Sequence, residues 1–225
     1  MYLINEWQRA VEQVVVPATV NGARVLGFAS PNPGAGVTSF SRAVAATLAR
    51  SGADVLYVDL ATPLRKGVPA HARAANASAW KEAVNDRAVG VQVVAPASLD
   101  ARFYFNNVRW LRGEFVRMLR TYSNIVVDMA PLLGEEADRV NAIAAAAACD
   151  AVAMICVQSA LTQLDMARAL QLTGSTGVNL IGTVVNEVNY TPPGEEIAAA
   201  IRRWWPSERV GRYLSDKISG SELLR

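Results

Sequence analysis

A glycine-rich turn followed by an alanine-rich helix is the clearest chemical signal in this chain of 225 residues. Residues 29–49 read ASPNPGAGVTSFSRAVAATLA and follow an apolar run, RVLGF. The backbone N–H groups of such a turn, together with the start of the helix, can surround phosphate groups. The sequence therefore predicts a phosphate-binding loop. Its candidate nucleotide-binding residues are Pro33, Gly34, Ala35, Gly36, Val37, Thr38 and Ser39.

The loop lacks one expected residue. Val37 stands where such loops carry the lysine that reaches the phosphates, whereas Thr38 keeps the hydroxyl that binds Mg²⁺. A charge-assisted hydrogen bond contributes about 1.5–3 kcal/mol, and cations at a transferring phosphoryl group are worth roughly a thousandfold or more in rate. ATP or ADP with Mg²⁺ is thus the candidate cofactor, with weakened binding and a larger loss of catalysis.

Two aspartates end apolar runs further along the chain. Asp59 ends DVLYVD, and Asp128 ends NIVVD. Carboxylates beside a phosphate loop suit the holding of hydrated Mg²⁺, so both are candidate metal ligands and, in an active enzyme, candidate catalytic residues. An aspartate at the end of a strand also commonly caps the following turn.

Six apolar runs, separated by helical patterns, indicate the fold. They lie at 24–30, 54–60, 90–96, 124–130, 151–157 and 180–188. This alternation predicts an α/β protein with a doubly wound, mainly parallel sheet and helices on both faces. The carboxyl ends of the strands then share one edge, which would receive Ser30 to Thr38, Asp59, Asp128, Pro131, Gln158 and Asn186.

The helical pattern between the third and fourth runs, residues 106–122, predicts an amphipathic surface helix with its arginines in solvent.

We expect a single domain over residues 1–225: an N-terminal helix and lead-in at 1–22, a core at 23–190 and a C-terminal helical segment at 191–225. Trp204 and Trp205 are expected to pack that last segment.

Composition gives no support to several classes of function. The 22 Lys and Arg against 20 Asp and Glu give a net charge of only +2, with no basic patch typical of nucleic-acid binding. No signal peptide or membrane span is expected, which favours the cytoplasm. Cys149 and Cys156 are interpreted as buried thiols, and the single histidine, His71, as a surface residue.

In this order, the segments FASPNPGAGVT, VLYVDLATPLRKG, NIVVDMAPL, DAVAMICVQSALTQLDMARALQLT and GVNLIGTVVNEV resemble the MinD/ParA class of P-loop ATPases over nearly the whole chain. Within that class the chain is most similar to the cytoplasmic domain of bacterial tyrosine kinases (BY-kinases) of polysaccharide export. The form of the loop, the LRK stretch after the second run and the N-terminal EWQRAVE carry this resemblance.

The resemblance implies roles for the matched residues. Thr38 would bind Mg²⁺, Asp59 and Asp128 would be the Walker acids, and Asn186 would lie near the adenine. Glu6 and Arg9 match a helix that joins subunits into a ring. The implied partners are further copies of the chain and an inner-membrane polysaccharide copolymerase or chain-length protein, which would place the protein at the inner membrane.

Departures from the family pattern are equally specific. Besides Val37, Ala61 replaces a second acid, and the C-terminal tyrosine cluster that BY-kinases phosphorylate is missing. The leading hypothesis is a degenerate scaffold or regulator of exopolysaccharide or capsule assembly. The alternatives are an ATPase or tyrosine kinase completed by its membrane partner, and a MinD/ParA-like spatial positioning protein.

Overall fold

The computed structural model describes residues 3–64, 80–86, 91–97, 99, 102–134, 138–158 and 161–187. The chain divides into two compact units, Met1–Asn186 and Glu187–Arg225, and every described helix and strand belongs to the first. The predicted segment 191–225, with its two tryptophans, and His71 lie outside the described residues. The single-domain assignment therefore stays a prediction.

The described elements alternate between helix and strand as the apolar runs predict. In chain order they are α1 (Leu3–Val20), β1 (Val25–Ala29), α2 (Val37–Arg50), β2 (Val55–Asp59), β3 (Trp80–Asp86), β4 (Val91–Pro96), α3 (Arg102–Phe105), α4 (Val108–Met118), β5 (Asn124–Asp128), α5 (Ala142–Ala148), β6 (Ala151–Val157), α6 (Gln163–Ser175) and β7 (Leu180–Asn186). All six predicted strands are confirmed.

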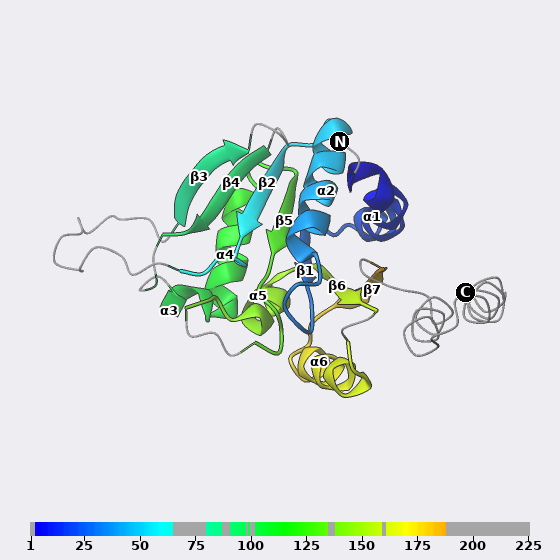
Figure 1. The fold of residues 1–225 in the computed structure, drawn as a ribbon. Coiled ribbons are helices and arrows are strands. Elements are labelled where there is room, and N and C mark those ends of the chain that lie inside the picture. Colours follow the sequence, from blue (N-terminus) through cyan, green and yellow to red (C-terminus); the bar gives the residue numbers. More distant parts are fainter. Residues whose placement is uncertain are drawn as a thin grey trace, which may run out of the picture. The chain divides into compact units, whose positions relative to one another are not determined.

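The strands form one seven-stranded sheet in the order β3-β4-β2-β5-β1-β6-β7 (Figure 1). Six of them pair in parallel, and β3 adds to one edge in the antiparallel sense. The sequence pattern did not predict β3, because its residues, WKEAVND, are mostly polar and form no apolar run. An edge strand does not need the two apolar faces of a central strand.

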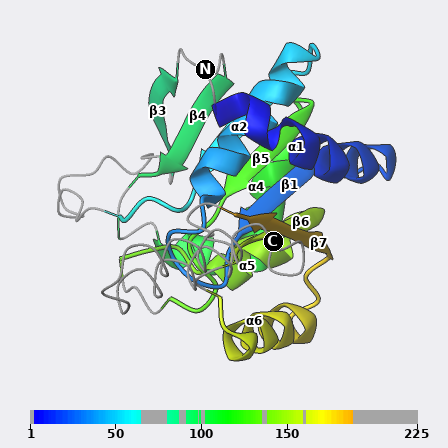
Figure 2. The same ribbon diagram turned by 45° about the vertical axis from the view of Figure 1, so that its right-hand side comes forward.

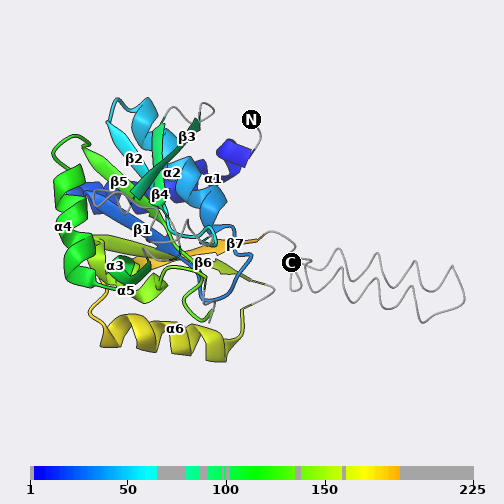
Figure 3. The same cartoon turned by 90° about the vertical axis from the view of Figure 1, so that its left-hand side faces the viewer.

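Helices cover both faces of the sheet, as expected for a doubly wound fold. Helices α1 and α2 pack on one face, and α4, α5 and α6 on the other, as the turned views in Figures 2 and 3 show. Strand β1 is buried along its whole length between these two layers. None of the described helices is long and apolar enough to cross a membrane.

Helix α4 confirms the predicted amphipathic helix, since Leu111, Phe115 and Met118 are buried. The arginines of the predicted helix, Arg109, Arg112, Arg117 and Arg120, are all exposed, as predicted, and Arg112 also makes a structural contact. The guanidinium of Arg112 donates through Nε and Nη2 to the carbonyl of Ala147 in α5, at 3.1 and 2.6 Å. The residue therefore satisfies a carbonyl group at the end of a neighbouring helix.

Gly27, in the middle of β1, is required by close packing. A Cβ atom there would lie 2.7 Å from Cε of Met129 and 2.8 Å from Sγ of Cys149. Because such overpacking costs about 1–3 kcal/mol, we expect Gly27→Ala to lower the free energy of unfolding by that amount in urea denaturation.

Gly113→Ala is the matched control. Gly113 is an exposed residue within α4, and nothing lies within 4 Å of its added Cβ atom. Alanine should stabilise that helix by about 0.5–1 kcal/mol. An unchanged stability of Gly27→Ala would contradict the described packing of β1.

Candidate functional site

The carboxyl ends of β1, β2 and β5 bring the predicted loop and acids to one edge of the sheet. Phe28 of β1 pairs with Asp128 of β5, and Asp59 of β2 pairs with Asp128 on its other side. The loop from Ser30 to Gly36 leaves β1 beside these acids and enters α2. Sequence-distant residues thus meet at one place, as the parallel topology predicts.

Two glycines give the loop its backbone conformation. Gly34 and Gly36 have φ angles of +82° and +86°, in the left-handed region that favours glycine. Gly36 also precedes α2 directly, and no side chain caps this helix. In contrast, side chains cap the described helices α4, α5 and α6. The first N–H groups of α2 thus lack the side-chain partner that these other helices have.

Side chains of two other segments, β7 and α6, and a hydrogen bond within the loop hold it in place. Nδ2 of Asn186, a buried residue at the end of β7, donates to the carbonyl oxygen of Ala35 at 2.9 Å. Oγ of Ser30 donates to the carbonyl of Asn32 at 2.7 Å, and Nδ2 of Asn32 donates to Oδ2 of Asp165 in α6 at 3.0 Å. The resemblance placed Asn186 near an adenine, whereas its amide here supports the loop backbone.

Val37, at the lysine position, contributes its side chain to the core. It is 8% exposed and belongs to the cluster that α1 and α2 form on the sheet, together with Val11 and Phe40. The ring of Trp7 in α1 packs edge-on against Phe40, with ring centroids 5.3 Å apart. Only the backbone N–H of Val37 is therefore available to a phosphate, and its side chain supports α1.

Among the described residues, Arg24 and Arg42 are the cations nearby in the sequence that could replace the lysine. Arg24 lies at the opposite edge of the sheet, where its guanidinium donates to the carbonyls of Leu119, Tyr122 and Ser123. Arg42, on α2 one turn after Thr38, is near enough for its charge to favour the ionised form of Asp128. Lys66 lies outside the described residues.

Asp128 is the buried acid of the site, with an exposed fraction of 1%. Its Oδ2 accepts a hydrogen bond from the hydroxyl of Tyr57 at 2.9 Å, and its Oδ1 has no hydrogen-bond partner among the described residues. Burial raises the pKa of Asp128 to about 6, and the nearby carboxylate of Asp59 adds to the rise. The hydroxyls of Thr38 and Tyr57 oppose it by favouring the charged form.

Asp59 mainly organises its own turn. Its Oδ1 accepts from the N–H groups of Ala61 and Thr62 at 3.1 and 3.0 Å, and its Oδ2 accepts from Oγ1 of Thr62 at 2.7 Å. Asp59 therefore caps the turn that follows its strand, which was the alternative to a metal role for an aspartate at this position. A metal role for Asp59 stays a prediction, and one that would compete with these three bonds.

Tyr57 and Ser41 are site residues that the sequence analysis missed. The hydroxyl of Tyr57 lies 3.0 Å from Oγ of Ser41 on α2, and both side chains are buried. Burial and the carboxylate of Asp128 raise the pKa of Tyr57, so its hydroxyl stays protonated. The available signal was a tyrosine inside an otherwise aliphatic strand, because a buried phenol needs a hydrogen-bond partner.

The remaining predicted residues lie where expected, without defining chemistry. Thr38 and Ser39 are exposed at the start of α2. Glu6 and Arg9 lie on α1, and Arg9 is exposed. Both cysteines are buried, which confirms their interpretation as core thiols.

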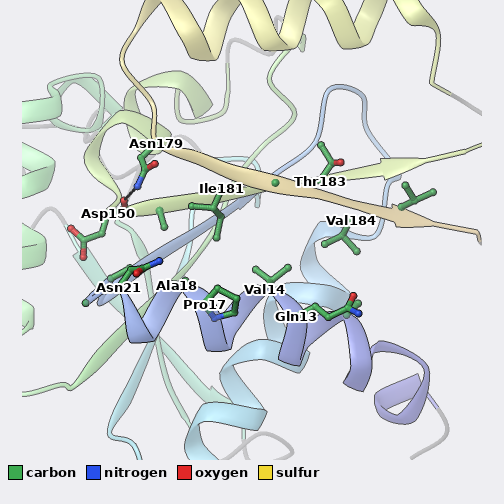
Figure 4. Close-up of a pocket in the computed structure, with 16 residues that line it drawn as sticks. Gln13, Val14, Pro17, Ala18, Asn21, Asp150, Asn179, Ile181, Thr183 and Val184 are labelled. Atoms are coloured by element: carbon green, nitrogen blue, oxygen red, sulfur yellow. Dashed lines mark hydrogen bonds between the residues drawn. The ribbon is translucent and has the colours of Figure 1, made fainter.

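A separate groove of about 850 Å³ lies between α1 and β7 (Figure 4). It begins at the amino ends of β1 and β6 and follows β7 as far as Val185, and no residue of the loop from Ser30 to Gly36 is among its described lining residues. The one ionisable side chain among its described lining residues is Asp150. Oδ2 of Asp150 accepts from the backbone N–H groups of Arg24 and Val25 at 2.9 and 2.8 Å, which gives it a structural role.

Comparisons with known proteins identify the fold. No protein-family model matches the sequence, and no curated protein does. Among solved structures, the kinase domain of the Escherichia coli tyrosine kinase ETK has a TM-score of 0.57 and 18% identity, over 73% of this chain and 67% of that one.

Two further structures belong to other functional groups. Cobyrinic acid a,c-diamide synthase from Mycobacterium smegmatis, with bound ATP analogue and magnesium, has a TM-score of 0.56 and 17% identity, over 82% of this chain and 83% of that one. The cell division protein MinD of Aquifex aeolicus has a TM-score of 0.52 and 15% identity, over 86% and 79%.

The chain therefore has the α/β fold of P-loop nucleoside triphosphatases. More narrowly, it is the form of this fold found in BY-kinase domains and MinD/ParA-like ATPases. This confirms the fold resemblance that the sequence carries. The fold alone does not determine the function, which depends on the residues of the site.

The raised pKa of Asp128 predicts a pH-dependent stability. An unfolded aspartate has a pKa of about 4, whereas burial holds that of Asp128 at about 6. Between these values the folded state binds more protons, so this group destabilises the protein as the pH rises. Asp128→Asn removes the effect. Between about pH 4 and pH 7, the free energy of unfolding of this variant should therefore rise by up to about 3 kcal/mol relative to that of the wild type. Parallel stability curves for the two proteins, measured by urea denaturation, would contradict the burial of this charge.

Proposed function

We propose that the protein is a degenerate BY-kinase-like scaffold or regulator in bacterial exopolysaccharide or capsule biosynthesis and export. It binds a Mg²⁺-bound adenine nucleotide weakly and turns it over slowly or not at all. The observation that carries this proposal is the burial of Val37 in the core at the position of the missing lysine, beside a loop that is otherwise in place.

The residues present fit a Mg²⁺-nucleotide without its lysine. The N–H groups of Gly36, Val37 and Thr38 would bind phosphate oxygens, since α2 begins there without a side-chain cap. The hydroxyl of Thr38 and the unpartnered Oδ1 of Asp128 would hold the hydrated metal. A bound Mg²⁺ would neutralise part of the phosphate charge, which the lysine does in an active loop.

The missing lysine should reduce the rate of ATP turnover more than the affinity for the nucleotide. Charge that develops on the phosphoryl group in the transition state needs a positioned cation. Val37 supplies none, and Ala61 removes the second acid that the family resemblance would place after Asp59. The oxygens of Asp59 itself are already engaged by its own turn.

The proposed partners follow from the resemblance to BY-kinases. They are the cytoplasmic segment of an inner-membrane polysaccharide copolymerase or chain-length protein, and further copies of this chain through Glu6 and Arg9 of α1. The protein would then work in the cytoplasm, peripheral to the inner membrane. No nucleic-acid partner is proposed, because the net charge is only +2.

A second candidate is an ATPase or tyrosine kinase that a partner completes by supplying an arginine or lysine. The unpartnered Oδ1 of Asp128 favours it, because the acid of an active site is still in place. Activity that arises only with the membrane partner's cytoplasmic fragment, and that Asp128→Asn abolishes, would select it. The similarity of fold to MinD supports a third candidate, a spatial positioning protein, which a polar focus of the protein in cells would select.

Calorimetric titration with ADP and with a non-hydrolysable ATP analogue, each with and without Mg²⁺, tests the proposal. We expect Mg²⁺-dependent binding about 10- to 150-fold weaker than a loop lysine would allow, because one charge-assisted hydrogen bond is missing. Thr38→Ala and Asp128→Asn should abolish the Mg²⁺ dependence.

Hydrolysis by the pure protein is measured in parallel. Robust Mg²⁺-dependent turnover of ATP would overturn the degenerate assignment. No binding up to millimolar nucleotide would exclude the nucleotide and leave a scaffold that acts through protein partners alone. Ser51→Ala, at the far end of α2, provides a control that should bind as the wild type does.

A further inference from the structure

Tyr57 is a buried polar residue that the proposed nucleotide site does not yet use. It lies in the middle of β2 and is 2% exposed. Its hydroxyl donates to Oδ2 of Asp128 at 2.9 Å and lies 3.0 Å from Oγ of Ser41. Because the hydroxyl of Tyr57 donates its hydrogen bond to the carboxylate, it accepts a hydrogen bond from Ser41.

This hydrogen bond determines which oxygen of Asp128 can meet a ligand. Oδ2 is occupied by Tyr57, and Oδ1 is buried without a partner among the described residues. A buried carboxylate oxygen left without a hydrogen bond is costly in free energy, and in a native structure it commonly marks a ligand or water site. Oδ1 is therefore the oxygen available to a hydrated cation.

The hydrogen bond between Tyr57 and Ser41 also reaches the helix that follows the phosphate loop. Ser41 lies in α2, about one turn after Val37. Because the one hydroxyl proton of Ser41 is donated to Tyr57, it is not available to the carbonyl oxygen of Thr38, 3.2 Å from Oγ. Tyr57 thus links β5, which carries Asp128, to the turn that carries the Thr38 hydroxyl and the first N–H groups of α2. Both groups expected to hold the metal are positioned by one side chain from β2.

The site suits a metal that arrives with its nucleotide. Among the described residues, no cluster of three histidine, cysteine, aspartate or glutamate side chains could hold an ion alone. Mg²⁺ keeps several waters and is commonly bound through one or two carboxylates together with substrate phosphates. A single carboxylate oxygen and one hydroxyl are enough for such a complex, provided that they are held rigidly.

We propose that Tyr57 is a positioning residue that makes this site selective for nucleoside di- or triphosphates in their Mg²⁺-bound form, by orienting Oδ1 of Asp128 toward the metal and by fixing the start of α2 through Ser41. This inference rests on the proposed nucleotide binding. It goes beyond it by assigning a role to a strand residue that need not touch the ligand.

Tyr57→Phe tests the assignment, because it removes the hydroxyl and keeps the ring. The measurement is calorimetric binding of ADP at a series of Mg²⁺ concentrations. The Mg²⁺ concentration for half-maximal binding should rise by about 10- to 100-fold, as it does when residues behind a metal ligand are removed. ADP binding without Mg²⁺ should not change. Loss of a merely structural hydrogen bond would lower the midpoint of thermal unfolding without shifting the Mg²⁺ dependence.

Ser41→Ala provides a second variant, which tests the positioning role of Tyr57 if Tyr57→Phe does not fold. It should shift the Mg²⁺ dependence in the same direction by a smaller factor. Thr47→Val is the matched control: it removes a hydroxyl that bonds the carbonyl of Ala43 at 2.8 Å in the same helix, away from the loop. This control should bind as the wild type does.

The outcomes distinguish the role of Tyr57 from the proposed nucleotide binding. Wild-type Mg²⁺ dependence in Tyr57→Phe and Ser41→Ala, in a protein that binds Mg²⁺-ADP, would overturn the role of Tyr57 and leave the nucleotide site standing. A wild-type protein that binds no ADP at any Mg²⁺ concentration would overturn the proposed nucleotide binding, and the inference with it.

Discussion

The position of β1 between β5 and β6 is the constraint on which the rest of the structure depends. The chain leaves β1 toward α2 on one face of the sheet, and it leaves β5 toward α5 on the other. In doubly wound sheets, ligands commonly bind at the carboxyl ends of strands whose connections diverge in this way. The pairing of Phe28 with Asp128 places the acid beside the loop. A register shift of one residue would turn the Asp128 side chain to the opposite face of the sheet.

The substitution that removes the loop's charge also contributes to packing. As a buried residue, Val37 joins Val11 and Phe40 under α1, where a fully buried valine contributes roughly 1.5–3 kcal/mol. A lysine at this position would have to leave that cluster to reach a phosphate. The loop thus shares its first helical residue with the contact between α1 and α2, so its chemistry and the docking of α1 are physically connected. A protein that works by assembly rather than turnover could retain such a residue.

The phosphate loop and the buried acid differ in how much of their geometry is fixed locally. Gly34 and Gly36 set the loop's shape by their backbone conformation, and Asn186 and Asp165 support it from β7 and α6. Asp128 depends on a tyrosine from another strand. The loop can therefore keep its form in a protein that has lost catalytic residues. The same fold is found in a tyrosine kinase, a synthase and a cell division protein, so the fold alone does not specify the chemistry.

The sequence by itself determined the six parallel strands, the helices between them and the edge at which Thr38, Asp59 and Asp128 meet, because apolar runs and parallel connections fix these features locally. It did not determine β3, whose residues carry no apolar run, nor the direction of the Val37 side chain. The sequence left two roles open for Asp59, and the structure selected the local one, the capping of its own turn. Only the tertiary structure decided that Asn186 supports the loop and that Tyr57 bonds one oxygen of Asp128, while the other has no hydrogen-bond partner among the described residues. Hydrogen bonds between residues 71 and 151 positions apart depend on how strands and helices pack, and no pattern along the chain specifies them.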